Sequence, residues 1–319
     1  MRLVRSFVDA AAFAGAAVSI GNFDGVHRGH QTMLRTLVSH AKSRGVPSLV
    51  MTFEPHPIAL LKPELAPPSL STLERKAELI AACGVDCLLG YPTARGLLDL
   101  TADEFFDRII RDHLQAAGLV EGPNFRFGKA RGGDVDLLAR LCEREGMFLE
   151  VLEPVADDLE GDGGGTMISS SRIRAAIADG RVAEAAGMLG HAYQIAGTVV
   201  RGDGRGREIG YPTANLDGVA TLLPAAGVYA GRALLEGVSH AAAINIGGNP
   251  TFGVESVKVE AHLIGFDGDL YGRPLRVDLL RRLRGVQPFA GRDELVAQLA
   301  ADVAAARAIV AETSSSPPR

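Results

Sequence analysis

The sequence predicts two domains, an α/β domain built on a parallel sheet and a small antiparallel β-barrel that ends in a helix. From residue 14 to about 155, apolar runs alternate with amphipathic patterns, which is typical of a parallel sheet covered by helices on both faces. Beyond residue 192, short β-rich runs are separated by Gly, Pro and Asp, which favours antiparallel strands. We place the domains at residues 1–185 and 186–312, and expect a disordered Ser-Pro tail at 313–319.

Hydrophobic spacing defines the elements of the first domain. Apolar runs predict its strands, at Ala16–Ile20, Ser48–Phe53, Val85–Leu89, Leu119–Val120 and Phe148–Leu152. Apolar residues at helical spacing follow the first strand, so a right-handed βαβ unit is expected there. Ser71 and Thr101 are each followed three residues later by Glu, which predicts two capping boxes, and Gly84 should end the first of these helices.

The second half is introduced by a Gly-rich break at residues 161–165 and by Ser169–Arg174, whose serines should cap a helix that ends near Gly180. Helical patterning stops at about Leu189. Five β runs follow, at Tyr193–Val200, Val228–Leu235, Ala241–Ile246, Val257–Ile264 and Leu275–Leu283. In the fourth run apolar and polar residues alternate, so Glu260 shares a face with Lys258 and His262. A terminal helix is predicted by the spacing of Leu295, Leu299, Val303 and Ile309.

Composition indicates a globular protein and excludes several function classes. The chain has 319 residues, 47 % of them hydrophobic, which is ample for two buried cores. A net charge of −5 gives no broad positive surface, so we expect neither nucleic acid nor a membrane as a partner. Cys83, Cys87 and Cys142 form no paired framework and are expected to be reduced, packed thiols. Reduced thiols imply a cytoplasmic protein, and with no apolar run of about 18 residues and no secretory signal the protein is expected to be soluble.

The most informative segment, Gly21–His30, carries two imidazoles three residues apart on a predicted strand-to-helix turn. The start of a helix offers unpaired backbone N–H groups and a partial positive charge, which suits the phosphates of a nucleotide. Gly21 and Gly25 allow the backbone to come close to such a ligand. Two other interpretations stay open: His27 and His30 simply end a loop, or they bind zinc, although no cysteine or close carboxylate cluster completes a zinc site.

Three further segments are candidates for the same crevice, since ligands of open α/β sheets bind beyond the carboxyl ends of the strands. Phe53–Pro57 presents His56 on a turn stiffened by prolines, unless this histidine is merely solvated. In Gly122–Gly128 the asparagine can hydrogen-bond a ribose, a phosphate or a ring edge, whereas the two phenylalanines also suit the core. Ser169–Arg174 offers hydroxyls, backbone donors and two guanidiniums to an anion, or serves as a plain helix cap.

Together these segments resemble the adenylyltransferase half of the bacterial bifunctional riboflavin kinase/FMN adenylyltransferase (FAD synthetase) family, in the family's order and approximate spacing. The resemblance implies a Rossmann-like nucleotidyltransferase fold in which His27 and His30 are catalytic and steady the ATP phosphates. It implies that ATP is bound by Gly21, Asn22, Phe23, Asp24, His27, His30, Ser170, Ser171, Arg172 and Arg174. It implies that the flavin substrate contacts Phe53, Pro55, His56, Asn124, Phe125 and Phe127. One departure is Met167, because the family usually has Lys or Arg just before the serines.

A second motif lies in the other half, where Arg201–Arg207 is followed by Ile209–Leu216. Its glycines permit close backbone approach to a phosphate and its arginines add charge, but it matches neither a Walker A nor a protein-kinase loop. Thr213 and Asn215 alternate onto one face of an extended segment, which gives two oxygen ligands suited to Mg²⁺. The alternative is that they are polar strand-end residues without a metal.

The second motif resembles the riboflavin kinase module of the same family, whose Pro-Thr-Ala-Asn segment matches Pro212–Asn215 without change. Further matches are Gly227–Ala230, Asn245–Gly247, Asn249–Phe252, Glu260–Leu263 and Leu270–Gly272. The resemblance implies a six-stranded β-barrel in which Thr213 and Asn215 hold Mg-ATP and Glu260 is the base toward the riboflavin 5′-hydroxyl. It implies that ATP is bound by Gly204, Arg205, Gly206, Arg207, Gly210, Pro212, Thr213 and Asn215. Without the family match, Glu260 is equally well a surface salt-bridge partner; Gly265 replaces an Asp of many relatives.

The sequence therefore predicts an enzyme that phosphorylates riboflavin to FMN with one ATP and adenylates FMN to FAD with another. In the second reaction an FMN phosphate oxygen attacks the α-phosphorus of ATP and pyrophosphate leaves. Catalysis then needs in-line positioning and charge neutralisation by Mg²⁺, arginine, and imidazolium or N–H donors. The expected cofactor is Mg²⁺, with ATP as co-substrate and riboflavin, FMN and FAD as substrates and products; the sequence leaves a homo-oligomer open.

Two rival functions are distinguishable from the same residues. A nucleotidyltransferase with another phosphorylated acceptor would not need the Thr213, Asn215 and Glu260 set. A flavin-binding regulator or carrier without turnover would be expected to have lost His27, His30 or Glu260, and none is lost.

Overall fold

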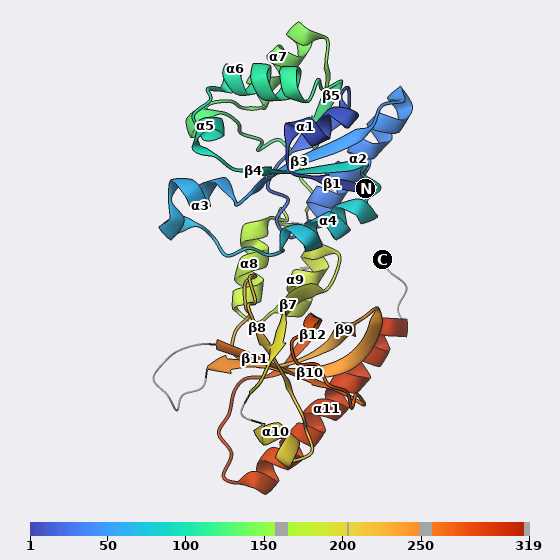
Figure 1. Cartoon of the computed structure of the whole chain (residues 1–319), viewed down its shortest axis with the longest axis vertical. Coiled ribbons are helices and arrows are strands. Elements are labelled where there is room, and N and C mark those ends of the chain that lie inside the picture. Colours follow the sequence, from blue (N-terminus) through green and yellow to red (C-terminus); the bar gives the residue numbers. More distant parts are fainter. Residues whose placement is uncertain (157–164, 203, 249–256, 316–319) are drawn as a thin grey trace. The chain divides into compact units, whose positions relative to one another are not determined.

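The computed structural model describes residues 1–156, 165–202, 204–248 and 257–315 (Figure 1). The chain divides into two compact units, Met1–Ser169 and Ser170–Arg319. The Gly-rich break at 161–165 lies almost entirely outside the described residues, and so does the Asn249–Phe252 motif. Within the described part, no helix has both the length and the apolar composition to cross a bilayer.

A six-stranded sheet with all its paired strands parallel forms the centre of the first unit, in the order β1-β4-β3-β2-β5-β6. Its strands are β1 (Arg2–Val4), β2 (Ala17–Ile20), β3 (Ser48–Glu54), β4 (Cys87–Pro92), β5 (Gly118–Glu121) and β6 (Phe148–Val151). The five predicted strands are present, and the prediction missed β1. This doubly wound order confirms the predicted α/β fold and brings the carboxyl ends of β2, β3 and β5 to one edge.

Helices cover both faces of this sheet, as expected (Figure 1). They are α1 (Phe7–Ala10), α2 (Arg28–Arg44), α3 (Pro57–Leu61), α4 (Leu73–Ala82), α5 (Arg95–Leu98), α6 (Ala102–Phe105) with its continuation Phe106–His113, and α7 (Val135–Glu145), joined by single turns at Ala11–Phe13, Pro63–Leu65 and Lys129–Arg131. Successive residues of β3 enter opposite cores: Val50 packs with Leu34 and Leu37 of α2, whereas Leu49 packs with the cluster that contains Phe106.

One of the two predicted helix starts was displaced by a residue. The capping box at Thr101 and Glu104 is confirmed. Helix α4, however, is capped by Thr72, whose hydroxyl accepts from the backbone N–H of Arg75, and not by Ser71. The Ser71 hydroxyl accepts instead from the backbone N–H of Gly25 at 3.1 Å, because the histidine turn lies against this segment.

The second unit is a closed antiparallel barrel with helices, which confirms the predicted architecture. Two helices precede it, α8 (Ser170–Ala178) and α9 (Val182–Leu189). Around the barrel the strands follow the order β10-β11-β8-β7-β12-β9. They are β7 (Tyr193–Val200), β8 (Ala214–Asp217), β9 (Gly227–Leu235), β10 (Val238–Gly248), β11 (Val257–Leu263) and β12 (Pro274–Arg284).

Two helices complete the second unit, a single turn α10 (Arg205–Glu208) and the long terminal helix α11 (Arg292–Ser315). Helix α11 packs against β9, β10 and β12, with Ala306 and Ile309 buried beside Ala230 (Figure 1). It runs through residue 315, so the prediction of a disordered tail from residue 313 was wrong for residues 313–315. Residues 316–319 lie outside the described part.

Candidate active sites

The histidine turn joins β2 to α2 and places His27 at the N-cap of that helix. Its Nδ1 accepts a hydrogen bond from the backbone N–H of His30 at 3.3 Å, so the ring proton of neutral His27 sits on Nε2. The two imidazoles stack with their centroids 3.6 Å apart and their planes at 16°. The residue before His30 is Gly29, and a Cβ at this position would come within 3.3 Å of the His27 ring. Glycine therefore leaves room for that ring.

Both imidazoles are held in the neutral form. Burial lowers the pKa of His27 from 6.5 to about 4, against the opposing effect of the Asp24 carboxylate. Burial also lowers the pKa of His30 well below its usual value, and the neighbouring His27 and Lys76 act in the same direction. At neutral pH the pair can therefore offer ring N–H donors to a ligand but not the positive charge of an imidazolium. The buried Nδ1 of His30 has no hydrogen-bond partner among the described residues.

The turn that carries the histidines is anchored to the chain before α4. Phe23 and Val26 have positive φ angles of 46° and 42°, a conformation that non-glycine residues adopt only when their surroundings enforce it. The buried Asp24 carboxylate accepts from the backbone N–H groups of Leu70 at 2.9 Å and Ser71 at 3.2 Å. Phe23 and Asp24, predicted as phosphate-binding residues, are thus buried supports of the turn; direct contact with phosphate stays a prediction.

A cavity of about 460 Å³ opens beside this turn. Seven residues of the predicted site line it: Gly21, Asn22, Phe53, His56, Asn124, Phe125 and Phe127. Pro55 is not among the lining residues, whereas its neighbour Pro57 is. Leu97, Leu98 and Phe105 make much of the wall apolar, and Arg126 and Arg131 add positive charge. Such a cavity suits a planar aromatic ring that carries an anionic group.

Some residues that line this cavity also have a structural role, among them Phe127 and His56. Phe125 and Phe127 stack at 5.5 Å, and Phe127 is buried in the core while it also lines the cavity; contact with the flavin stays a prediction. His56 is the N-cap of α3, where its Nδ1 accepts from the backbone N–H of Ile58 at 3.2 Å. This histidine is therefore fixed in orientation at the edge of the cavity.

The segment before the serines meets the same unit at Asn124. Met167 pairs with Ala156 in a short antiparallel bridge, and its sulfur lies 3.9 Å from the amide nitrogen of Asn124. Ser170, Ser171, Arg172 and Arg174 form the first turns of α8 in the second unit. Their part in phosphate binding stays a prediction. For the zinc alternative, no group of three or more His, Cys, Asp or Glu in the described part of the chain could hold a metal ion.

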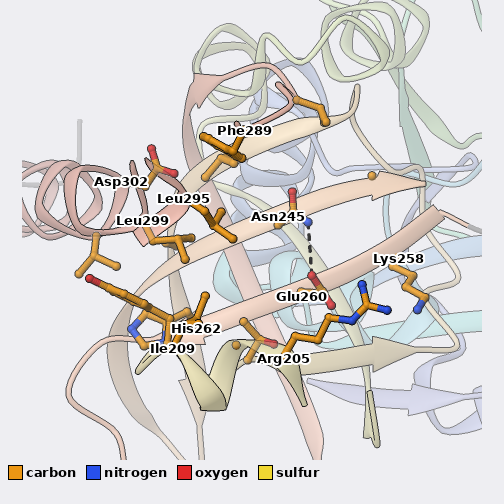
Figure 2. A pocket seen from close by; sticks show the side chains of 18 of the residues that line it. Arg205, Ile209, Asn245, Lys258, Glu260, His262, Phe289, Leu295, Leu299 and Asp302 are labelled. Carbon is orange, nitrogen blue, oxygen red and sulfur yellow. Dashed lines mark hydrogen bonds between the residues drawn. The ribbon is translucent and has the colours of Figure 1, made fainter. Parts of the chain in front are cut away.

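In the second unit, three neighbouring strands bring polar side chains together across the barrel surface. Glu260 on β11 is the register partner of Asn245 on β10 and of Asn215 on β8. The Asn245 amide donates to a carboxylate oxygen of Glu260 at 3.3 Å (Figure 2). Val259 and Ala261 point into the core, so Glu260 lies on the outer face with Lys258 and His262, as the alternation predicted.

A cavity of about 380 Å³ lies over these strands (Figure 2). Six residues of the predicted kinase site line it: Gly204, Arg205, Gly206, Thr213, Asn215 and Glu260. Phe289, Leu295 and Leu299, the two leucines from α11, give it an apolar side. A second cavity of about 230 Å³ shares Thr213 and is lined by Arg207 and Pro212. Gly210 lines neither of these two cavities.

Three side chains at this site were given no role from the sequence. Asn245 orients Glu260. His262 donates through Nδ1 to the carbonyl oxygen of Pro212 at 2.8 Å, which holds the Pro-Thr-Ala-Asn segment against β11. Arg284 forms a buried ion pair with Asp302 of α11, with Nη2 and Oδ2 2.8 Å apart, at the wall of the larger cavity. Their partners lie 15 to 50 residues away, so local sequence pattern gives little signal for them.

Mg²⁺ fits the oxygen ligands of this cavity. Thr213 and Asn215 both line it and offer a hydroxyl and an amide oxygen, which is the donor chemistry that Mg²⁺ takes from proteins besides water and phosphate. The loop before α10 comes close to the Asn215 amide: a Cβ at Gly202 would lie 2.3 Å from its nitrogen. Glycine at this position therefore leaves room for the amide.

Comparison with known proteins finds a different family match in each half of the chain. The family model of FAD synthetase matches residues 9–172, and that of riboflavin kinase matches residues 189–310. The bifunctional riboflavin kinase/FMN adenylyltransferase of Escherichia coli (strain K12) is 39 % identical over 315 residues, covering 96 % of this chain and 97 % of the relative. The protein of the same name from Pseudomonas fluorescens is 40 % identical over 301 residues, covering 94 % of each chain.

The chain belongs to the family of bifunctional riboflavin kinases/FMN adenylyltransferases. A crystal structure from Streptococcus pneumoniae, described as a macrolide-efflux protein, has the same fold, with a TM-score of 0.84 and 32 % identity over 96 % of this chain and 98 % of the other. The FAD synthetase match contains the histidine turn and its cavity, and ends within the serine-arginine segment. The riboflavin kinase match contains the barrel and most of α11.

Proposed function

We propose that this enzyme phosphorylates riboflavin at the Glu260 cavity and adenylates the resulting FMN at the histidine turn. The observation that carries the proposal is that each family match contains its own cavity with its own polar cluster. Riboflavin, FMN and ATP are then its small-molecule partners. All three cysteines are free, and burial raises the pKa of Cys87 and Cys142 to about 11, which supports reduced thiols in the cytoplasm.

In the kinase reaction Glu260 accepts the proton of the riboflavin 5′-hydroxyl as the hydroxyl oxygen attacks the γ-phosphorus of ATP, whose bond to the leaving ADP breaks. General-base assistance of this kind contributes roughly 10²- to 10⁴-fold. The Asn245 hydrogen bond holds one carboxylate oxygen and leaves the other for the substrate. Thr213 and Asn215 would hold Mg²⁺, which when bound screens the charge of the phosphates. The apolar residues of α11 offer a surface for the flavin ring.

In the adenylyl transfer, a phosphate oxygen of FMN attacks the α-phosphorus of ATP and the bond to pyrophosphate breaks. No protein nucleophile is needed, so the chain contributes positioning and hydrogen bonds to the developing charge. Nε2–H of His27 and the ring of His30 supply donors at the start of α2, beside the backbone N–H groups of that helix. The apolar cavity with Phe125 and Phe127 receives the flavin ring, and Asn124 contacts the substrate.

A time course with purified protein, riboflavin, Mg²⁺ and ATP tests the proposal, with flavins separated by chromatography. FMN should appear first and FAD later. His30→Ala should slow FAD formation sharply and leave FMN formation intact, whereas Glu260→Ala should slow FMN formation from riboflavin and leave FAD formation from added FMN intact. Equal loss of both activities in either variant contradicts the two-site proposal. Failure of the wild type to turn FMN into FAD would favour another phosphorylated acceptor, and no turnover at all would favour a flavin-binding regulator.

A further inference from the structure

Lys76 is a buried cation that forms no ion pair among the described residues, although the charges of two carboxylates, Asp24 and Glu54, favour its ammonium form. It lies near the start of α4 with 6 % of its surface exposed. Its ammonium donates to the Thr52 hydroxyl oxygen at 3.3 Å, and no carboxylate of the described residues forms an ion pair with it. Burying an unpaired charge is costly, so this lysine points to a role at a binding site.

A short chain of hydrogen bonds links Lys76 to the histidine turn. An ammonium can only donate, so the Thr52 hydroxyl accepts from Lys76 and must direct its own proton elsewhere. That proton goes to the carbonyl oxygen of Asn22, 3.1 Å away. Asn22 lines the adenylyl-transfer cavity and precedes Asp24, which is anchored next to α4. Lys76 therefore fixes the direction of the hydrogen bond from Thr52 to Asn22, which holds the start of the histidine turn.

The charge of Lys76 also reaches the site. It lowers the pKa of His30 together with burial and His27, whereas Asp24 and Glu54 favour the ammonium form of the lysine against its burial. Since both histidines are neutral, the negative charge of a triphosphate must be offset by other groups. Met167, just before the serines, does not provide such a charge.

We propose that Lys76 is a positioning residue for adenylyl transfer, whose buried ammonium orients the Asn22 turn through Thr52 and offsets the charge of the ATP phosphates from behind that turn. The proposal rests on the adenylyl transfer proposed above. It differs from a structural role in a measurable way. A lysine kept for stability would lower folding stability when removed, whereas a lysine kept for ATP would lower ATP affinity and leave the fold equally stable.

Lys76→Met tests this, because methionine keeps an unbranched side chain and removes the charge. FAD formation from FMN is measured at varied ATP in the full chain, without riboflavin. The Michaelis constant for ATP should rise about tenfold or more, as expected for the loss of a bond to a charged group, and thermal unfolding should occur at an equal or higher temperature. Lys42→Met, at an exposed lysine of α2, is the matched control and should change neither quantity.

An ATP Michaelis constant within twofold of wild type in Lys76→Met overturns the inference. If that variant does not fold, Thr52→Val, which removes only the hydroxyl, is measured in the same way; it should raise the constant, and an unchanged constant overturns the inference. The two proposals fail differently. Wild-type protein that makes no FAD from FMN and ATP refutes the adenylyl transfer, whereas wild-type activity with an unaffected Lys76→Met refutes only the role of Lys76.

Discussion

His27 combines three functions in one side chain: it caps α2 through Nδ1, stacks on His30, and leaves Nε2–H for a ligand. The capping bond needs the neutral ring, because a protonated Nδ1 could not accept the His30 N–H. The burial that keeps the ring neutral also means that protonating His27 at low pH lowers the stability of the folded state. The geometry of the histidine turn and the pH dependence of folding stability are therefore linked at this residue.

We predict that acid destabilises the first unit through His27. In the unfolded chain its pKa is about 6.5 and in the fold about 4, so between these values the unfolded chain binds more protons. The stability present above pH 6.5 is lost as the pH falls toward 4, by roughly 3 kcal/mol for this one group. In His27→Asn, which keeps a capping oxygen, the melting temperature should fall less between pH 7 and pH 5. His113→Asn, at an exposed histidine, should follow wild type; parallel profiles for all three would contradict the prediction.

A second prediction concerns Asn245, which holds Glu260 through a bond of 3.3 Å to its carboxylate. Asn245→Ala leaves the base present but free to rotate, so FMN formation from riboflavin should fall about tenfold, the order expected for a bond to a charged group. FAD formation from added FMN should stay at the wild-type rate, which serves as the internal control. Unchanged kinase activity would show that Glu260 is held by other contacts.

At the scale of elements, α11 is joined to β12 by two ion pairs that differ in burial. Arg284 and Asp302 are 2.8 Å apart with side-chain exposures of 18 % and 5 %, and Gln298 also donates to Asp302. Arg281 and Glu312 lie 3.9 Å apart with 56 % and 65 % exposed. The first pair lies at the wall of the kinase cavity, so it links the docking of the helix to the shape of the site.

Asp302→Asn should therefore destabilise the second unit by roughly 3–5 kcal/mol, because it leaves the Arg284 guanidinium buried without a counter-charge. Riboflavin phosphorylation should weaken with it, since α11 forms one side of the cavity. Glu312→Gln is the matched control at the exposed pair and should change the melting temperature far less. Equal effects of the two substitutions, measured by thermal unfolding, would show that the burial of the ion pair does not matter.

Elements were predictable where a local pattern decides them. The continuous apolar runs of β2 and β3 and the alternation in β11 each report which faces are buried. The three-residue β1 was missed because it is too short to show a period and is defined by its pairing with β4. The start of α4 was misplaced because Ser71 and Thr72 can both cap a helix, and only the contact of Ser71 with Gly25 decides between them.

The candidate sites were predictable as motifs but not as contacts. His27, His30 and Glu260 stand in segments whose resemblance to the family is local, so each could be singled out. The bonds of Glu260 to Asn245 and of Lys76 to Thr52 depend on strand register and on packing between distant segments. A buried lysine on an amphipathic helix looks like any solvated residue until its surroundings are known.

For the whole molecule, the cavities proposed for the two activities are lined by residues of different compact units. The adenylyl-transfer cavity is lined by residues 20–131 and the kinase cavity by residues 204–303. No residue is shared between these two linings. A substitution in the lining of one cavity should therefore leave the activity of the other cavity unchanged. FMN is the product of one cavity and the substrate of the other, so only FMN has to pass from site to site.

We therefore predict complementation between two inactive variants. Glu260→Ala cannot supply FMN and His30→Ala cannot use it efficiently, so neither alone should turn riboflavin into FAD at an appreciable rate. Mixed in equal amounts with Mg²⁺ and ATP, they should produce FAD after a lag in which FMN accumulates, because FMN released by one protein binds the other. Doubling the amount of Glu260→Ala should raise the rate at which FMN is converted to FAD. The rate at which FMN forms from riboflavin should not change. If the mixture makes FMN but no FAD, while Glu260→Ala converts added FMN, then FMN does not leave the kinase site freely.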